Sequence, residues 1–296
     1  MSRRRSLPYR IVRSLLVLAL LLTLASLAFL WYVGAWNVVF PSKQHDSVAP
    51  LLPAELSSPS VLVFSKTNGF RHKEGIEGGA RVLDRIARGH RWGYFHTENG
   101  AVFNPRDLAR FDAVVFLNAS GDMLSVEQEK AFQQWMEAGG GWLGIHAAGD
   151  GSHVGWQWYM DELIGAEFTA HIMDPQFQRA IVLLENQQHP ALRDVPDIWE
   201  HEEEWYSWAS SPRGKGFTIL ATLDEESYTP VQKLLGRERD LRMGDHPVVW
   251  SNCVGSGRSI YVAMGHRASA FTQPQVRQIL DNALVWLTSK GVDPGC

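Results

Sequence analysis

Gly139 to Asp150 reads GGGWLGIHAAGD, and this stretch decides how the surrounding chain is expected to fold. The glycine run can supply the left-handed cap that ends a preceding helix. Trp142 to Ile145 is short and apolar, as expected of a strand that is covered on both faces. The small residues after His146 let the backbone turn sharply. The stretch therefore predicts a strand, a tight turn at His146 and a following helix.

His146 is expected at the carboxyl end of this strand, which is the edge where open α/β sheets bind ligands. A polar residue on a strand-to-helix turn also matches the layout of a nucleophile elbow, although histidine acts as a base or a ligand rather than as a nucleophile. The alternative is a histidine that is buried for packing and hydrogen-bonded to a neighbouring loop. Position alone leaves these two interpretations balanced.

Strands and helices alternate on both sides of this element. Upstream, strands are predicted at 61–64, 92–97 and 112–117, with a helix at 74–89 and another that Ser125 caps. Downstream, a short helix at 156–164 precedes strands at 179–185, 200–208, 217–223, 246–253 and 259–264, and a helix follows at 273–287. Such alternation indicates an α/β domain, here residues 60–290, with a mostly parallel sheet and helices on both faces.

The N-terminal region predicts a membrane anchor. Five arginines precede residues 15–33, an apolar run without charge that, at about 1.5 Å per residue, is long enough to cross a hydrocarbon core. Trp31, Tyr32 and Trp36 lie where interfacial aromatic residues belong, and the arginines favour a cytoplasmic N-terminus. A cleaved signal peptide is the alternative, but the run exceeds its usual length of ~7–15 residues.

This interpretation divides the chain into four parts. They are a basic cytoplasmic tail (1–14), a transmembrane signal-anchor helix (15–33), a linker rich in Pro and Ser (34–59) and the domain (60–290), which is expected to be extracytoplasmic, either periplasmic or at the cell surface. The chain has a net charge of −4, and because five arginines lie in the tail, the domain is more acidic than the whole. An acidic domain argues against nucleic acid as a partner.

Polar side chains fall at several predicted strand ends and loops. They are Arg71, His72, His146, His171 and His266. If 200–208 is one strand, its period-two alternation adds one face with Glu202, Glu204, Tyr206 and Trp208. Trp205 and its aromatic neighbours form a lining suited to sugars. We therefore expect one pocket over the carboxyl edge of the sheet, although each of these residues alone could equally be structural.

The sequence contains none of the fixed spacings that identify common cofactor sites. It has no His-Glu-x-x-His or Cys-x-x-Cys motif, so a divalent metal is possible but no motif indicates it. It has no Walker loop and no dinucleotide-binding fingerprint either. The cofactor therefore stays open at this stage.

An ordered set of short motifs resembles the trehalose-utilisation (ThuA-like) family. The set comprises Phe70-Arg71-His72, Gly140 to Ala148, Phe168 with His171, His189-Pro190, Glu203 to Tyr206, Asp245 to Trp250, Gly257-Arg258 and Gly265-His266. Each motif alone is weak, but their order over about residues 60 to 288 is specific. The resemblance implies a class I glutamine amidotransferase-like fold, a flavodoxin-like sandwich, which agrees with the alternation of strands and helices.

The chain departs from true glutamine amidotransferases at the elbow, where they carry a cysteine nucleophile and this chain has His146. An imidazole cannot form the thioester, so amidotransferase activity is the least favoured function. Glu203, where Asp is more usual in the ThuA-like pattern, and the N-terminal anchor are further departures. The resemblance implies a role in the catabolism of sugars or keto-sugars, with a carbohydrate as the small-molecule ligand.

The leading hypothesis is an enzyme that cleaves 3-keto-glycosides by elimination or hydrolysis. A carbonyl at C3 acidifies the C2 proton, so a base can remove that proton and expel the glycosidic oxygen. His146 or Glu204 would act as the base. The oxyanion would be stabilised by Arg71, by His72 or by a divalent metal. Substrate binding would fall to Arg71, Tyr206, His171, His266 and Trp205. The alternative is a non-catalytic carbohydrate-binding or scaffold protein with an enzyme-like cleft.

Overall fold

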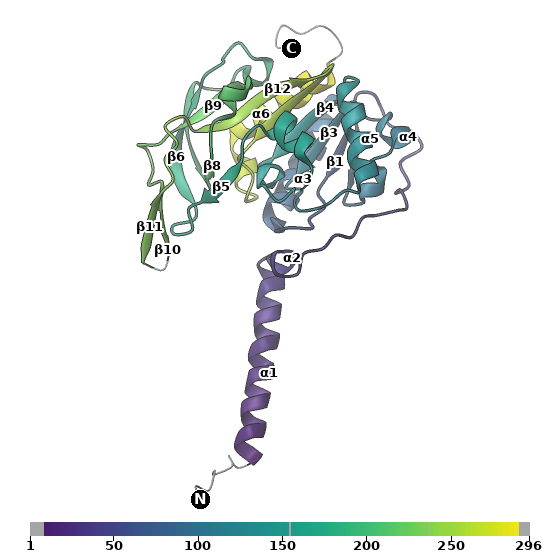
Figure 1. Ribbon diagram of the computed structural model, residues 1–296. Helices are drawn as coiled ribbons and strands as arrows, with labels where there is room; N and C mark the ends of the chain where they lie inside the picture. The colour runs from purple at the N-terminus through teal and green to yellow at the C-terminus, as the bar shows by residue number, and fades with distance from the viewer. Residues whose placement is uncertain (1–8, 154, 235, 290–296) are drawn as a thin grey trace, which may run out of the picture.

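Within the described residues, 9–153, 155–234 and 236–289, a nine-stranded mixed sheet forms the centre of the computed structural model (Figure 1). Its strand order is β2-β1-β3-β4-β13-β12-β9-β6-β7. The first five strands in this order are parallel, and the last four continue the sheet with antiparallel pairings. The expected α/β fold with a mostly parallel sheet is therefore confirmed.

Apart from residues 200–208, the strands lie close to their expected positions in the sequence. The strands of the central sheet are β1 (Ser60–Phe64), β2 (Gly93–Thr97), β3 (Ala113–Leu117), β4 (Gly141–Ile145), β6 (Gln178–Leu184), β7 (Ile198–Glu203), β9 (Thr218–Asp224), β12 (Pro247–Val254) and β13 (Gly257–Val262). Two small ribbons lie outside it, β5 (Phe168–His171) with β8 (Tyr206–Trp208), and β10 (Val231–Leu234) with β11 (Arg237–Asp240).

Helices cover both faces of the sheet. Alternation along β3 directs Leu117 toward α3 (Lys73–His90), where a Cβ on Gly79 would meet it at 2.4 Å. α6 (Pro274–Thr288) packs on the same face beside α3. Phe116, on the other face, stacks on Phe132 of α5 (Val126–Glu137) and on Tyr159. Both faces of the parallel strands are therefore buried.

Short helices complete the chain. They are α2 (Trp36–Val39), η1 (Gly100–Val102), α4 (Pro105–Leu108), η2 (His146–Gly149), the π-helix η3 (Tyr159–Ile164), η4 (Pro190–Leu192), η5 (Pro212–Lys215) and η6 (Ala270–Thr272). The predicted cap of α5 is confirmed, since Ser125 and Gln128 form a capping box.

The directions of the strands bring residues from several distant segments of the chain to one edge of the sheet. β7 and β9 run in the same direction as the parallel strands. The reason is that an even number of antiparallel strand pairings lies between β13 and each of them. The residues that follow β1, β3, β4, β7, β9 and β13 therefore meet at one edge, and β12 begins there. This edge is where a binding site is expected.

One predicted strand is wrong. Residues 200–208 are not continuous, because β7 ends at Glu203 and the chain leaves the central sheet before β8 pairs with β5. Within β7, His201 and Glu203 are buried and Glu202 is exposed. Glu202 therefore does not share a face with Glu204, Tyr206 and Trp208, as the alternation of a single strand implied.

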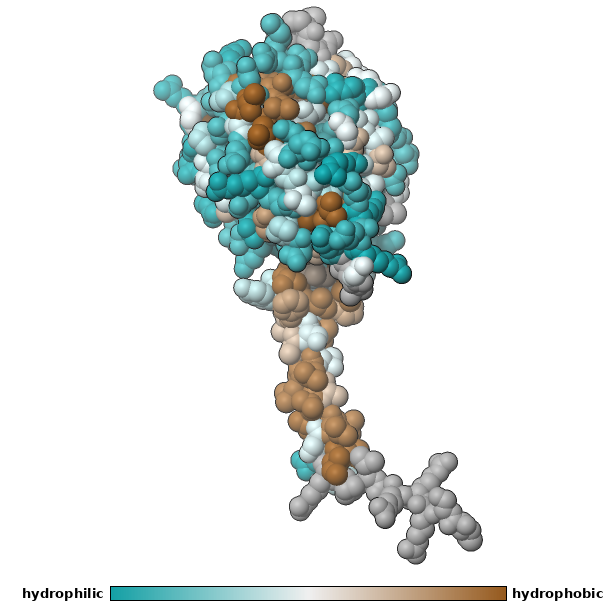
Figure 2. Space-filling model, turned by 90° about the vertical axis from the view of Figure 1, so that its left-hand side faces the viewer, coloured by the Kyte–Doolittle hydropathy of each residue, from teal (hydrophilic) through white to brown (hydrophobic). Residues whose placement is uncertain are grey.

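The N-terminal helix α1 (Tyr9–Tyr32) extends away from the domain (Figure 1). Its segment Ile11–Tyr32 has 22 residues, a mean hydropathy of 2.4 and no buried portion. Figure 2 shows a hydrophobic rod below a largely hydrophilic domain. The helix is long and apolar enough to span a membrane, a test that a signal sequence also passes. The tail residues Arg3, Arg4 and Arg5 lie outside the described residues.

The segment between α1 and β1 lies against the domain. The Asn37 side chain donates to the carbonyl of Thr67 over 2.8 Å. Further along, the Asn99 side chain donates to the Val48 carbonyl over 3.0 Å. The Gln128 side chain donates to the Asp46 carbonyl over 2.7 Å. These hydrogen bonds hold residues 37–48 against the domain.

Candidate active site

The turn after β4 places His146 in the left-handed region of backbone space, with φ of 49°. A side chain at such a φ is uncommon and marks a constrained turn. The Tyr261 hydroxyl fixes this turn by donating to the His146 carbonyl over 2.7 Å. Gly149 leaves room for the same ring, since a Cβ there would lie 2.7 Å from it. The predicted strand-to-helix turn at His146 is confirmed.

The His146 imidazole is fully buried, and one of its nitrogens has a fixed role. Nδ1 donates to the Ala263 carbonyl over 2.7 Å, because a carbonyl oxygen can only accept. Nε2 lies 3.3 Å from His266 Nδ1 and 3.5 Å from Glu204 Oε2. Burial alone would lower the pKa of His146, but Glu204 and Glu203 outweigh burial and raise it above its ordinary value.

Glu204 follows β7 and is the carboxylate at the centre of the site. Its Oε2 lies 3.0 Å from His266 Nδ1, and its Oε1 lies 3.1 Å from His171 Nδ1. The Gln176 amide also donates to Oε1. Burial would raise the pKa of Glu204, but hydrogen bonds and charges from His146 and His266 lower it far below its ordinary value. Glu204 is therefore ionised.

Glu203 stabilises the site through hydrogen bonds to two backbone amides. Its Oε1 accepts from the Glu204 amide over 2.9 Å, and its Oε2 accepts from the Gly265 amide over 2.7 Å. Glu203 thus ties the end of β7 to the loop that carries His266. Burial raises its pKa, but His201 and His146 lower it more, so this side chain is also a carboxylate. The sequence marked Glu203 only as a departure from a family pattern.

His72 approaches the same point from the loop after β1. Its ring centroid lies 4.8 Å from that of His146 and 4.6 Å from that of His266, edge to face in both cases. It is 6% exposed, and its Nδ1 has no hydrogen-bond partner. Burial and the neighbouring histidines lower the pKa of His72 well below its ordinary value, so the ring is neutral. We refer to His72, His146, Glu204 and His266 as the His146 cluster.

A cavity of about 760 Å³ opens above the His146 cluster. His72, His171, Glu204, Tyr206 and His266 line it, whereas His146 lies beneath the Tyr206 ring at a centroid distance of 4.3 Å. Aromatic walls come from Phe70, Phe168 and Tyr206. Such a combination of apolar walls and a few convergent polar groups is typical of small-molecule sites.

The segment after α1 forms another wall of this cavity. Its contributing residues are Asn37, Val38, Pro41, Ser42 and Lys43. No pattern in the sequence indicated that the expected linker would reach the site. Gln176 and Asp150 also line the cavity, and sequence reasoning missed both because neither lies at a predicted strand end. Burial raises the pKa of Asp150.

Two residues expected at the site lie elsewhere. The Arg71 guanidinium pairs with Glu98 over 2.7 Å and borders a separate cavity of about 290 Å³ with Trp31 and Tyr32. The Trp205 indole is buried behind the sheet edge and donates to the Gln178 carbonyl over 2.9 Å. Neither side chain lines the large cavity, so the structure brings together the histidines, Glu204 and Tyr206 but not Arg71 or Trp205.

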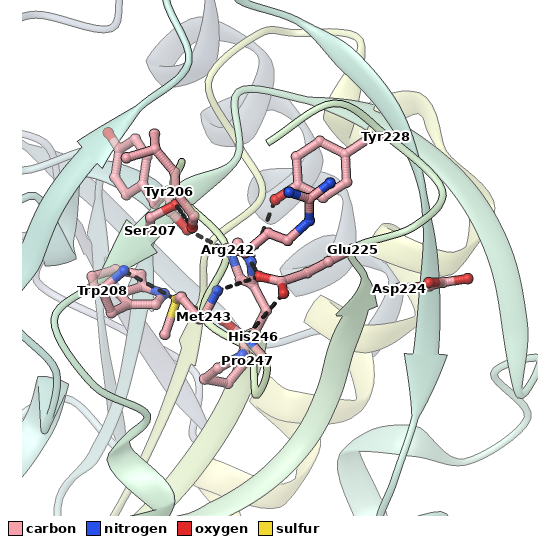
Figure 3. Close-up of polar contacts among 12 residues, drawn as sticks. Tyr206, Ser207, Trp208, Asp224, Glu225, Tyr228, Arg242, Met243, His246 and Pro247 are labelled. Atoms are coloured by element: carbon pink, nitrogen blue, oxygen red, sulfur yellow. Dashed lines mark hydrogen bonds and ion pairs between the residues drawn. The ribbon is translucent and has the colours of Figure 1, made fainter. Parts of the chain in front are cut away.

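A second histidine–glutamate pair lies at the same edge (Figure 3). His246 Nδ1 donates to Glu225 Oε1 over 2.9 Å, and His246 Nε2 donates to the Tyr206 carbonyl over 2.8 Å. Glu225 also accepts from the amides of Met243 (2.6 Å) and Gly244 (2.9 Å). Burial raises the pKa of Glu225, but His246 and these amides lower it to about 2. We call this group the His246 clamp.

Comparison with known proteins agrees with the fold and the motif order. The family model ThuA, described as trehalose utilisation, matches residues 60–287. A ThuA-like protein from Bacteroides uniformis is 27% identical, with a TM-score of 0.66 over 81% of this chain and 95% of that one. One from Parabacteroides merdae is 16% identical, with a TM-score of 0.59 over 79% and 93%. No curated protein matches the chain.

Proposed function

The chain belongs to the ThuA family of trehalose utilisation, and on this premise we propose that it cleaves glycosides oxidised at C3 of the sugar. The single observation that carries the proposal is the pairing of His171 with Glu204 on the cavity floor, at 3.1 Å. A histidine held by a buried carboxylate is suited to general-base catalysis, and the aromatic walls suit a sugar ring.

The reaction we propose is a β-elimination. The base takes the proton from C2, and the C2–H electrons form a C1=C2 double bond through an enolate at the C3 carbonyl. The C1–O bond then breaks, and the departing glycosidic oxygen receives a proton to leave as an alcohol. Addition of water to the unsaturated sugar would complete a net hydrolysis. The two demands on the protein are a base at C2 and stabilisation of negative charge at the C3 oxygen.

We propose His171 rather than His146 as the base. His171 lines the cavity and its side chain is 25% exposed, whereas His146 is fully buried beneath Tyr206. Glu204 Oε1 faces His171 Nδ1, which leaves Nε2 as the nitrogen that can take a proton. His72 and His266 line the same cavity and would stabilise the C3 oxyanion.

We further propose that α1 anchors the protein in a membrane with residues 1–14 in the cytoplasm and the domain of residues 60–290 on the other side. The exposed apolar surface of α1 and the five arginines before residue 15 support this orientation. Reporters fused to the C-terminus test it. We expect phosphatase activity and no fluorescence from a reporter that folds only in the cytoplasm, and the opposite result would overturn the orientation.

A panel of disaccharides and their 3-keto derivatives tests the reaction. The full chain in detergent should be used, because Asn37, Val38 and residues 41–43 line the cavity. We expect cleavage of 3-keto-glycosides, no cleavage of the parent sugars, and slower cleavage when C2 carries deuterium. Equal cleavage of the parent sugars would overturn the elimination. Binding of keto-glycosides without turnover would identify a carbohydrate-binding protein instead.

A further inference from the structure

The donor atoms of the His146 cluster converge on one point. The four side chains come from the loop after β1, the turn after β4, the end of β7 and the loop after β13, and one donor atom from each lies within 4.8 Å of all the others. We propose that His72, His146, Glu204 and His266 bind one divalent transition-metal ion at the floor of the cavity.

The spacing of three donor atoms is that of a coordination shell. His146 Nε2 lies 3.3 Å from His266 Nδ1 and 3.5 Å from Glu204 Oε2, and the last two atoms are 3.0 Å apart. Bonds of about 2.0–2.2 Å around one ion put neighbouring donors roughly 3.0–3.5 Å apart. His72 supplies the fourth donor atom, which lies within 4.8 Å of the other three.

The hydrogen-bond pattern also determines which atoms are available to a cation. Because His146 Nδ1 donates to the Ala263 carbonyl, Nε2 is the nitrogen that faces the cluster, and a bound ion would take the place of any proton on it. The other oxygen of Glu204 is occupied by His171 and Gln176, which leaves Oε2 for the ion. The buried His72 Nδ1 has no hydrogen-bond partner, and an unpaired buried nitrogen is costly.

The donor set selects the class of ion. Three imidazole nitrogens and one carboxylate suit Zn²⁺, Mn²⁺ or a similar transition ion, whereas Mg²⁺ and Ca²⁺ prefer shells made of oxygen. His72, Glu204 and His266 line the cavity, so a bound ion would face the substrate. There it would act as a Lewis acid on the C3 oxygen, a role that rests on the proposed function. The binding site itself rests on geometry alone.

Titration of the metal-free protein tests the site without any substrate. The full chain in detergent is treated with chelator, dialysed and titrated with Zn²⁺, Mn²⁺ and Mg²⁺ by calorimetry, and bound metal is counted by elemental analysis. We expect one Zn²⁺ or Mn²⁺ per chain, no detectable Mg²⁺, and a rise in the thermal midpoint on metal addition. Retention of no transition ion would overturn the inference.

Single substitutions locate the ion. His266→Gln and Glu204→Gln should each weaken binding at least about tenfold, and His72→Ala serves as a further variant should one of them not fold. Glu225→Gln in the His246 clamp is the matched control and should keep the wild-type affinity. Unchanged binding in the cluster variants would place the ion elsewhere and overturn the inference.

The metal site and the proposed function can fail independently. Cleavage of 3-keto-glycosides by protein shown to hold no metal would remove the catalytic role of the ion. Metal binding without cleavage would count against the proposed function only.

Discussion

Two histidine–glutamate groups lie at one edge of the same sheet, and they use their polar atoms in opposite ways. In the His246 clamp both ring nitrogens donate to acceptors, and Glu225 accepts two backbone amides as well. In the His146 cluster three rings crowd one carboxylate, and His72 Nδ1 has no partner. The clamp does not border the large cavity, whereas the cluster forms its floor.

The difference separates stabilising from functional polar groups. A buried network in which every donor finds an acceptor rigidifies the structure. A buried cluster whose donor atoms converge, and which includes a nitrogen without a hydrogen bond, makes the folded state less stable. Such a cost is expected at a site where a bound ligand supplies the missing interactions. The two groups are connected through Tyr206. His246 donates to its backbone carbonyl (Figure 3), and the Tyr206 ring centroid lies 4.3 Å from that of His146.

The largest expected effect is on catalysis, and the two glutamates form a matched pair. Glu204→Gln should lower kcat/KM for 3-keto-glycosides at least about 100-fold, because it removes the charge that orients His171. Glu225→Gln should leave the rate within about twofold. Steady-state assays of both variants measure this. Equal losses in the two variants would show that the cluster and the clamp are not functionally distinct.

Stability should respond in the opposite order. Glu225→Gln weakens a hydrogen-bonded ion pair that holds the loop of Met243 and His246, so unfolding should become easier by about 1–3 kcal/mol. The corresponding fall in the thermal midpoint is roughly 2–4 °C per kcal/mol. His72→Asn should cost less, because His72 Nδ1 has no hydrogen bond to lose. A larger loss from His72→Asn would contradict the comparison.

Acid titration should measure the contribution of Glu225, in the His246 clamp, to the stability of the protein. The pKa of Glu225 is lowered from 4.5 to about 2, so its contribution to stability is complete above pH 4.5 and is lost as the pH falls toward 2. Thermal midpoints of wild-type protein and Glu225→Gln should therefore converge over this window as the pH is lowered. Other carboxylates affect both proteins alike, and the difference between the two curves is the measured quantity. A constant difference across the window would show that Glu225 does not titrate there.

The parallel half of the fold was predictable because its signals are local. β4 is an apolar run between a glycine cap and a small-residue turn, and β1 and β3 are equally apolar. Residues 200–208 were predicted as one strand because β7 and the separate strand β8 after it have the same aromatic and acidic composition. Only the change of pairing partner after Glu203 distinguishes them, and that depends on tertiary contacts.

The candidate site was predictable in so far as strand ends determine it. His72, His146, His171, Glu204 and His266 meet because chain order and strand direction bring their loops to one edge. Arg71 is next to His72 in sequence, yet it turns outward to Glu98, and no pattern distinguishes the two directions. Gln176 comes from an irregular segment, and the wall comes from the short helix α2 and the irregular residues after it. The positions of both depend on long-range hydrogen bonds that the sequence does not display.

The smallest expected effect concerns that wall, and two shortened chains measure it. Residues 34–296 keep the hydrogen bonds from Arg71 N to Gly34 O (3.0 Å) and from Asn37 to Thr67 (2.8 Å) that hold the wall in place. Residues 44–296 lack every wall residue from Asn37 to Lys43. We expect the shorter chain to show a KM roughly three- to tenfold higher, since a few lost contacts are worth about 1 kcal/mol of binding. Its kcat should be unchanged, because the donor atoms of the His146 cluster all lie beyond residue 44. A changed kcat with constant KM would mean instead that this segment positions the cluster through the loop of Arg71 and His72.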